Sequence, residues 1–190
     1  MKSLVLLAGC GLGDGSCIEE VILTYLALEK HHCTYQPVAQ PMSVPSIDHR
    51  SEDVGAMRDV LAESARMGRG IIQPLDNIDP NEFNCLMIPG GIGLVRNYSK
   101  NEAVRTLLFS FLEQGKPVAT MCAGIDFLRS FLGTDLLQAQ CNSLSPTSFC
   151  HDPARNIYYT PAFRCPANLV EVQEGIERMV GAIHASTAQA

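Results

Sequence analysis

The chain has 190 residues, of which 46% are hydrophobic and 18% are charged. A chain of this length and composition can bury one full core, so we expect a single domain spanning residues 1–190. The net charge of −6 argues against a nucleic-acid partner, and the apolar stretches are too short to cross a membrane. The eight cysteines are expected to remain thiols in a reducing cytoplasm.

The first predicted element is an apolar strand at Leu4–Ala8, followed by a glycine-rich loop at Gly9–Gly15. The stretch from Leu4 to Cys10 resembles a lipoprotein processing signal, but its apolar part is too short for a signal peptide. The glycines of the loop form neither a G-x-G-x-x-G nor a G-K-[ST] pattern. We therefore interpret the loop as a strand-to-helix turn and expect no cofactor.

A helix is predicted after this loop, with Ser16 as its cap and Glu19 completing a capping box. Its apolar stripe is predicted to comprise Ile18, Val21, Ile22, Tyr25 and Leu26. Glu20 lies away from this stripe, in the first turn of a helix that leaves the carboxyl end of the first strand. Ligand sites of open α/β sheets gather at such strand ends, which makes Glu20 a candidate site residue.

Strands and helices continue to alternate along the chain. Further strands are predicted at Cys33–Val38, Asn84–Ile88 and Asn156–Thr160, and the proline-rich stretch with Pro37, Pro41 and Pro45 is predicted as a loop. Helices are predicted at Ser51–Met67, Lys100–Glu113 and Pro166–Ile183. The alternation predicts an α/β fold with a doubly wound, mostly parallel sheet and helices on both faces.

The most informative segment is Pro117–Ile125, where an apolar run leads into Cys122, two small residues and a helical pattern. This order predicts a buried parallel strand, a tight turn that carries Cys122, and a helix. Most cysteines are inert packing, and only this setting distinguishes Cys122 from the other seven. The positive end of the helix is expected to lower the pKa of the thiol.

A second turn, Pro89-Gly90-Gly91, follows a predicted buried strand and is expected to open at the same edge of the sheet. The backbone N–H groups of Gly91 and Ala123 are candidates for stabilising an oxyanion, with Gly90 in the same substrate-binding turn.

The sequence predicts no metal site. The clusters His31-His32-Cys33 and Cys150-His151 lack the paired spacing of zinc ligands. A homodimer is suggested by Leu23 and Ala27, which add apolar surface outside the main stripe of the first helix.

These residues together resemble the PfpI / class I glutamine amidotransferase-like superfamily, most closely its ElbB branch (sigma cross-reacting protein 27A-like). The resemblance covers nearly the whole chain and runs through Ser16–Leu26, Arg58–Leu75, Leu86–Asn97, Met121–Ala123 and Thr160–Ala162. It implies a flavodoxin-like fold, Cys122 as the elbow nucleophile and Glu20 as a protonated acid that hydrogen-bonds the cysteine. Members include glutathione-independent glyoxalases, proteases, amidases, chaperone-like proteins and redox-responsive proteins.

Departures from the family pattern narrow the choice. The chain lacks the late His-x-Glu of glutaminases, and Ala123 replaces the histidine that usually follows the nucleophile in proteases. His151 with Asp152 is interpreted as part of a solvated loop. The chain also looks shorter than typical ElbB proteins after Asn97 and between Leu132 and His151, which would alter or open the pocket.

The leading hypothesis is a weak glyoxalase-like lyase that acts on small reactive carbonyls without glutathione. Cys122 would add to glyoxal or methylglyoxal, and Glu20 would move a proton between adjacent carbons to give a 2-hydroxy acid. Two alternatives use the same residues: a non-catalytic redox or metabolite sensor, and a binding module with a vestigial site.

Overall fold

Seven strands form the central sheet in the computed structural model, which describes residues 1–138 and 143–188. Across the sheet these are β5 (Gln73–Pro74), β2 (Thr34–Ala39), β1 (Lys2–Leu7), β6 (Cys85–Ile88), β7 (Val118–Met121), β9 (Ile157–Thr160) and β8 (Cys150–Asp152). All neighbouring pairs are parallel except β8 with β9. The predicted mostly parallel sheet is confirmed, and β8 is an antiparallel edge strand where the sequence predicts a loop.

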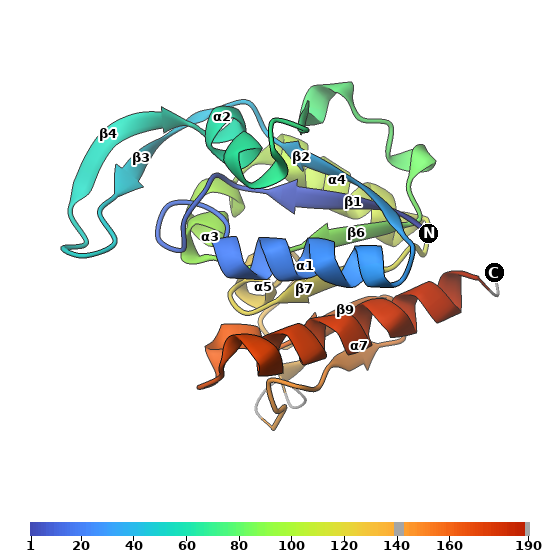
Figure 1. Cartoon of the computed structure of the whole chain (residues 1–190). Helices are drawn as coiled ribbons and strands as arrows, with labels where there is room; N and C mark the ends of the chain where they lie inside the picture. Colours follow the sequence, from blue (N-terminus) through green and yellow to red (C-terminus); the bar gives the residue numbers. More distant parts are fainter. Residues whose placement is uncertain (139–142, 189–190) are drawn as a thin grey trace.

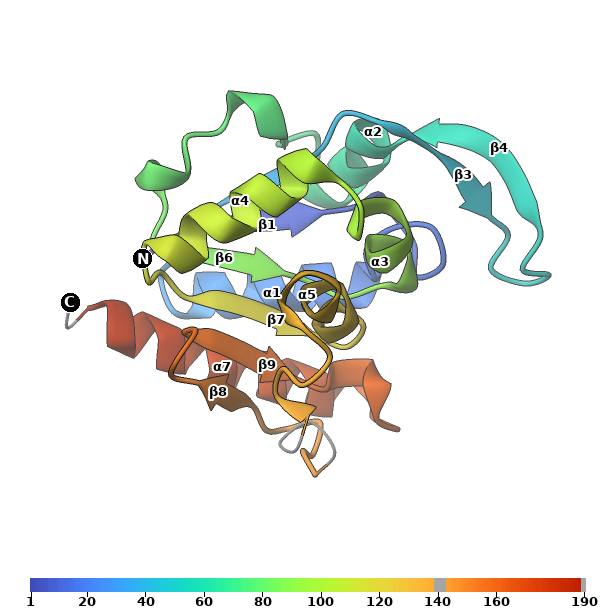
Figure 2. The same ribbon diagram turned by 180° about the vertical axis from the view of Figure 1, so that it is seen from behind.

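Helices cover both faces of the sheet. On one face α1 (Ile18–Lys30) lies beside α7 (Leu169–Thr187), as Figure 1 shows. The other face carries α3 (Ile92–Tyr98), α4 (Glu102–Glu113) and α5 (Gly124–Leu132), which are visible in Figure 2. A separate apolar cluster fills the space between the sheet and each layer. The doubly wound, flavodoxin-like fold is therefore confirmed, and none of the described helices is both long and apolar enough to cross a bilayer.

The largest departure from the predicted elements is at residues 43–59. Here β3 (Ser43–Ile47) and β4 (Val54–Asp59) form an antiparallel hairpin that projects beside the main sheet (Figures 1 and 2). The sequence predicts a loop and the first half of a helix at these positions. The helix α2 (Val60–Ala65) begins only after Asp59, whose side chain accepts a hydrogen bond from Ala62 N at 2.6 Å.

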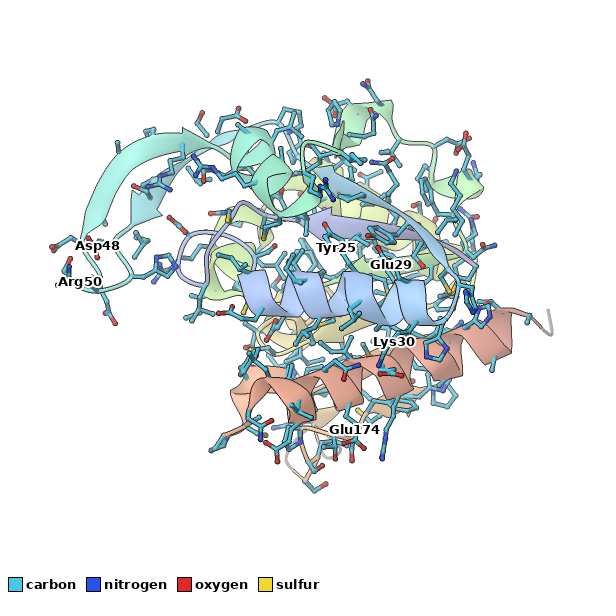
Figure 3. All side chains as sticks on the ribbon, in the orientation of Figure 1. Tyr25, Glu29, Lys30, Asp48, Arg50 and Glu174 are labelled. Carbon is cyan, nitrogen blue, oxygen red and sulfur yellow. The ribbon has the colours of Figure 1, made fainter. Side chains whose placement is uncertain are left out.

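The strand β4, which replaces the first half of the predicted helix, does not bury its apolar residues. Every residue of β4 is exposed, including Val54 at 72% and Met57 at 62%. Asp48 holds the turn by accepting a hydrogen bond from Arg50 N at 2.8 Å, and both residues lie at the tip in Figure 3. Local turn chemistry, rather than burial of an amphipathic helix, therefore decides the structure of this segment.

The buried face of α1 is rotated relative to the predicted stripe. Val21 and Tyr25 are buried as predicted, but Ile18, Ile22 and Leu26 are 42–46% exposed. The face towards the sheet instead carries two polar residues, Glu20 and Thr24, and both are completely buried. The start of the helix also differs from the prediction, because Cys17 is the N-cap and Ser16 Oγ accepts a hydrogen bond from Ala8 N.

The surface that suggested a homodimer is also different. Ala27 is completely buried in the apolar cluster that α1 shares with α7, and Leu23 packs against that cluster. The prediction that Leu23 and Ala27 present a free apolar surface is therefore wrong, and the homodimer itself stays a prediction.

Tyr98 links α3 to two strands of the sheet. Its hydroxyl donates to Leu7 O at 2.7 Å and accepts from Gln40 N at 3.1 Å, and the side chain is completely buried. We expect Tyr98→Phe to lower the free energy of unfolding by about 1–3 kcal/mol, because it leaves the buried Leu7 carbonyl and the partly buried Gln40 N–H without this partner. Urea unfolding measures the loss. Tyr35→Phe is the matched control, since the Tyr35 hydroxyl bonds Glu29 at the exposed surface; equal losses in both variants would contradict the prediction.

Candidate functional site

Cys122 occupies a strained turn between β7 and α5. Its φ is 49°, in the left-handed region that residues with side chains rarely adopt. The Cys122 N–H donates to Thr160 O at 3.2 Å, which ties the turn to the end of β9. A Cβ at Gly124 would lie 1.9 Å from Thr120 Oγ1, so the sharp start of α5 requires glycine. The predicted strand–turn–helix around Cys122 is confirmed.

Glu20 lies beside this turn and is 0% exposed. Its Oε2 accepts a hydrogen bond from Gly90 N at 2.8 Å. The Cys122 thiol and the Phe163 backbone N–H also lie close enough to the carboxyl group to lower its pKa, while Glu20 Oε1 has no hydrogen-bond partner among the described residues. Burial outweighs these contacts and raises the pKa of Glu20 to about 7. The structure thus brings together the two residues that the sequence singled out, and it places Glu20 inside the core rather than outside it.

The whole Cys122 residue is only 9% exposed. Burial raises its pKa, and the negative charge of Glu20 raises it further. The Ala123 N–H and the charge of Arg164 act in the opposite direction without cancelling the rise. The expectation that the end of α5 lowers this pKa is therefore wrong, because desolvation and a carboxyl neighbour outweigh the helix. Near neutral pH a thiol faces a carboxyl group that titrates at about pH 7.

The turn Pro89-Gly90-Gly91 after β6 holds the Glu20 side chain in position. A Cβ at Gly90 would lie 2.5 Å from Glu20 Oε2 and 2.9 Å from Cys122 Cβ, so no larger residue fits between the two groups. Because the Gly90 N–H is bonded to Glu20, Gly90 serves to hold the carboxyl group. This leaves the N–H groups of Gly91 and Ala123 as the candidate oxyanion donors of the turn.

The glycine-rich loop packs tightly against this turn. A Cβ at Gly93 would lie 1.9 Å from Gly15 N, and Cys17 N donates to Gly90 O at 2.8 Å. Within the loop, Gly15 N donates to Gly11 O at 2.8 Å. The loop is thus a strand-to-helix turn whose contacts fix the start of α1, and with it Glu20.

Sequence reasoning missed the turn that follows β9. A single 3-10 turn, Ala162–Arg164, packs over the site, and Ala162 adopts a φ of 46°. Its last residue, Arg164, forms an ion pair with Asp126 of α5, with 2.5 Å between Nη1 and Oδ2. An arginine after a strand carries no recognisable pattern; the only signal was the family match at Thr160–Ala162.

The other candidates lie in different surroundings. The His151 ring stacks on Tyr158 at 4.0 Å, and Asp152 pairs with Arg155, so the interpretation of His151 and Asp152 as a solvated loop is replaced by an edge strand. Cys33 Sγ lies 3.6 Å from His184 Nδ1. Among residues 1–138 and 143–188, no three histidine, cysteine, aspartate or glutamate side chains are grouped to hold a metal ion. Cys141 lies outside the described residues.

This geometry is that of an α/β protein with a cysteine at a strained elbow above a parallel sheet. The DJ-1/PfpI family model matches residues 44–139, slightly more than half of the chain, and the chain belongs to that family. A solved structure from Ehrlichia chaffeensis, an isoprenoid biosynthesis protein with an amidotransferase-like domain, is similar over 98% of this chain and 100% of its own, with a TM-score of 0.89 and 25% identity. The family and ElbB-like resemblance is therefore confirmed.

Three curated relatives are similar over different shares of the chain. Human glutamine amidotransferase-like class 1 domain-containing protein 3, mitochondrial, is 31% identical over 62% of this chain, which spans about half (49%) of the human protein. The rat ES1 protein homolog, mitochondrial, is 28% identical over 93% of this chain and 80% of its own length. Deglycase TK1284 of Thermococcus kodakarensis is 42% identical over only 29% of this chain and 32% of its own length. The mitochondrial relatives contradict the predicted cytoplasmic location.

Proposed function

We propose that this chain is a cysteine-dependent enzyme that converts small 2-oxoaldehydes to 2-hydroxy acids without glutathione. The observation that carries the proposal is the completely buried Glu20 carboxyl group against the Cys122 thiol, with a pKa raised to about 7. A group with such a pKa can both accept and donate a proton near neutral pH, which is what a general acid–base catalyst requires. The short similarity to a deglycase supports chemistry on reactive carbonyl compounds.

The first step is addition of the thiol to the aldehyde. The Glu20 carboxylate accepts the thiol proton while the sulfur of Cys122 bonds to the aldehyde carbon, and the carbonyl π electrons move to the oxygen. Glu20 then returns the proton to that oxygen, which completes a hemithioacetal. The N–H groups of Gly91 and Ala123 are placed in the turns around the sulfur to stabilise the oxygen while it is charged.

The second step moves hydrogen between neighbouring carbons. Glu20 removes the proton from the former aldehyde carbon, giving an enediolate, and returns it to the adjacent carbon, while the proton of the hemithioacetal hydroxyl passes to the neighbouring oxygen. The result is a thioester of a 2-hydroxy acid on Cys122. Water cleaves this thioester, which releases the 2-hydroxy acid and restores the thiol. Since the redox change is internal to the substrate, no external oxidant or cofactor is needed.

The small exposed fraction of Cys122 favours small substrates. At 9% exposure the sulfur cannot meet the backbone of a folded protein, whereas glyoxal and methylglyoxal have only a few heavy atoms. The raised pKa of the thiol leaves little free thiolate for peroxides to oxidise, and aldehyde addition proceeds because Glu20 takes the thiol proton during the attack. The site therefore favours a small carbonyl compound as its partner.

The test is an assay of the wild-type protein with methylglyoxal in the absence of glutathione. We expect loss of methylglyoxal and formation of lactate to continue well beyond one equivalent per protein chain. Loss that stops at one equivalent, with no lactate, would overturn the proposal. Peroxide oxidation of Cys122, followed by mass spectrometry of its peptide, then tests the sensor directly.

A further inference from the structure

A cluster of two arginines and one carboxylate lies next to Cys122. Asp126 Oδ2 is 2.5 Å from Arg164 Nη1, and Asp126 Oδ1 is 3.6 Å from Arg129 Nη1. Two guanidinium groups therefore share one carboxylate, which leaves the cluster with one net positive charge. Since Asp126 lies in the first turn of α5, four residues beyond the thiol, this charge belongs to the same end of the sheet as the sulfur.

The two arginines differ in what remains available to a ligand. Arg129 is only 17% exposed, and its Nε and Nη2 donate to Leu136 O at 3.1 and 3.0 Å. Arg164 is 43% exposed, and its recorded side-chain hydrogen bond is the one from Nη1 to Asp126. The guanidinium N–H groups of Arg164 that do not bond Asp126 are thus the part of the cluster that can bind an anion from solution.

The backbone places Arg164 beside the reacting groups. It ends the 3-10 turn Ala162–Arg164, which starts two residues after Thr160, the residue whose carbonyl oxygen accepts the Cys122 N–H. The N–H of the preceding residue, Phe163, lies close enough to the Glu20 carboxyl group to lower its pKa. Arg164 is close enough to the sulfur for each charge to shift the pKa of the other group. An anion held by Arg164 therefore lies near the thiol.

We propose that Arg164 binds a carboxylate of the substrate, so that the preferred substrate is a 2-oxoaldehyde with a carboxylate at its far end. A planar guanidinium fits a carboxylate through two parallel hydrogen bonds, which positions the remainder of the molecule. This inference rests on the proposed function. In the reaction the aldehyde hydrogen moves to the neighbouring carbon and one water is added, so the product is a 2-hydroxy dicarboxylic acid.

Alkylation of Cys122 tests the anion preference without any turnover. Iodoacetate and iodoacetamide alkylate the same sulfur and differ in the negative charge, so the ratio of their rates cancels changes in thiol pKa. Mass spectrometry of the Cys122 peptide gives both rates. We expect Arg164→Gln to lower the iodoacetate-to-iodoacetamide ratio by roughly threefold to fivefold, the scale of an exposed charge pair, and 0.5 M NaCl to lower it in wild type.

Arg129→Gln is the matched control, because it removes a positive charge from the same cluster without removing the exposed guanidinium. Its rate ratio should stay close to that of wild type, and Arg164→Lys should retain part of the preference. An unchanged ratio in Arg164→Gln, or an equal fall in Arg129→Gln, would overturn the inference.

Turnover separates this inference from the proposed function. The assay compares methylglyoxal with 4,5-dioxopentanoate, which carries the same 2-oxoaldehyde and a terminal carboxylate. We expect Arg164→Gln to lower the ratio of kcat/KM for 4,5-dioxopentanoate to kcat/KM for methylglyoxal, a ratio in which any change in the thiol pKa cancels. Turnover of both compounds with the same ratio in wild type and Arg164→Gln would overturn the inference alone. Turnover of neither, with an alkylation ratio that depends on Arg164, would overturn the proposed function and the substrate assignment while retaining the anion site.

Discussion

Replacing Cys122 with serine is expected to reduce lactate formation from methylglyoxal by roughly 10³-fold or more, as loss of a nucleophile does in other enzymes. The Glu20 carboxylate, with a pKa of about 7, can take a proton from a thiol during attack but is far too weak a base for an alcohol. Lactate is measured after incubation with methylglyoxal and without glutathione.

Cys10→Ser is the control for this loss. Cys10 is a partly exposed cysteine of the glycine-rich loop and should be replaceable with little effect on turnover. Retention of more than a tenth of wild-type turnover in Cys122→Ser would exclude the sulfur as the nucleophile. Far-UV circular dichroism checks that both variants are folded.

Glu20→Gln is expected to reduce the same turnover by about 10²- to 10⁴-fold, the range for loss of a general acid–base group. Glutamine keeps the size of the side chain and can still accept the Gly90 N–H, but it cannot carry a proton between carbons. In wild type we expect kcat/KM to rise with pH through about 7, where the Glu20 carboxylate forms. The residual activity of the variant should lack this rise.

Glu19→Gln is the matched control, since Glu19 is the exposed neighbour of Glu20 on the first turn of α1. It changes the same charge one residue away and should preserve the rate and the rise with pH, with the midpoint shifted slightly to lower pH because the Glu19 charge adds to the raised pKa of Glu20. A wild-type profile that is flat between pH 6 and 8, or a similar loss in both variants, would show that Glu20 is not the proton carrier.

The same residue predicts an effect on stability. The pKa of Glu20 is about 7 in the folded chain against an ordinary value of 4.5, so the folded state binds more protons between these values. The free energy of unfolding of wild type should therefore fall as pH rises from about 4.5 to 7, by roughly 3 kcal/mol in total. Glu20→Gln removes this term and should be more stable than wild type at pH 8. Urea unfolding at pH 5 and pH 8 compares them, and equal pH dependence in both proteins would contradict the assignment.

The sheet and the elbow could be predicted because their signals are local. The run from Val118 to Met121 is apolar except for the small Thr120, as expected of a strand buried on both faces, and small residues follow Cys122 where the chain bends. The strand-to-helix alternation then determined the layers. The exposed hairpin could not be found in this way, since β4 buries none of its residues and its side chains leave no burial pattern.

The burial of Glu20 could not be predicted from a helical wheel. A wheel assigns a glutamate to solvent because burial of a lone carboxyl group is costly. Here the cost is reduced by contacts from elements distant in sequence: the Gly90 N–H, the Phe163 N–H and the Cys122 thiol. The prediction of a lowered thiol pKa was wrong for the same reason. The position of Cys122 at a helix end can be predicted from the local sequence, whereas its desolvation depends on residues distant in sequence.

The hairpin of β3 and β4 has a consequence for the motions of the native chain. It forms a two-stranded sheet of its own, and it is attached to the glycine-rich loop by hydrogen bonds from Ile47 N to Asp14 Oδ2 and from Gly13 N to His49 Nε2. Since β4 is wholly exposed and β3 buries only Val44 and Ser46, the hairpin can open while the main sheet stays intact. Its amide hydrogens should exchange with solvent orders of magnitude faster than those of β1 or β7. Each opening also breaks these two hydrogen bonds to the loop from which α1 begins.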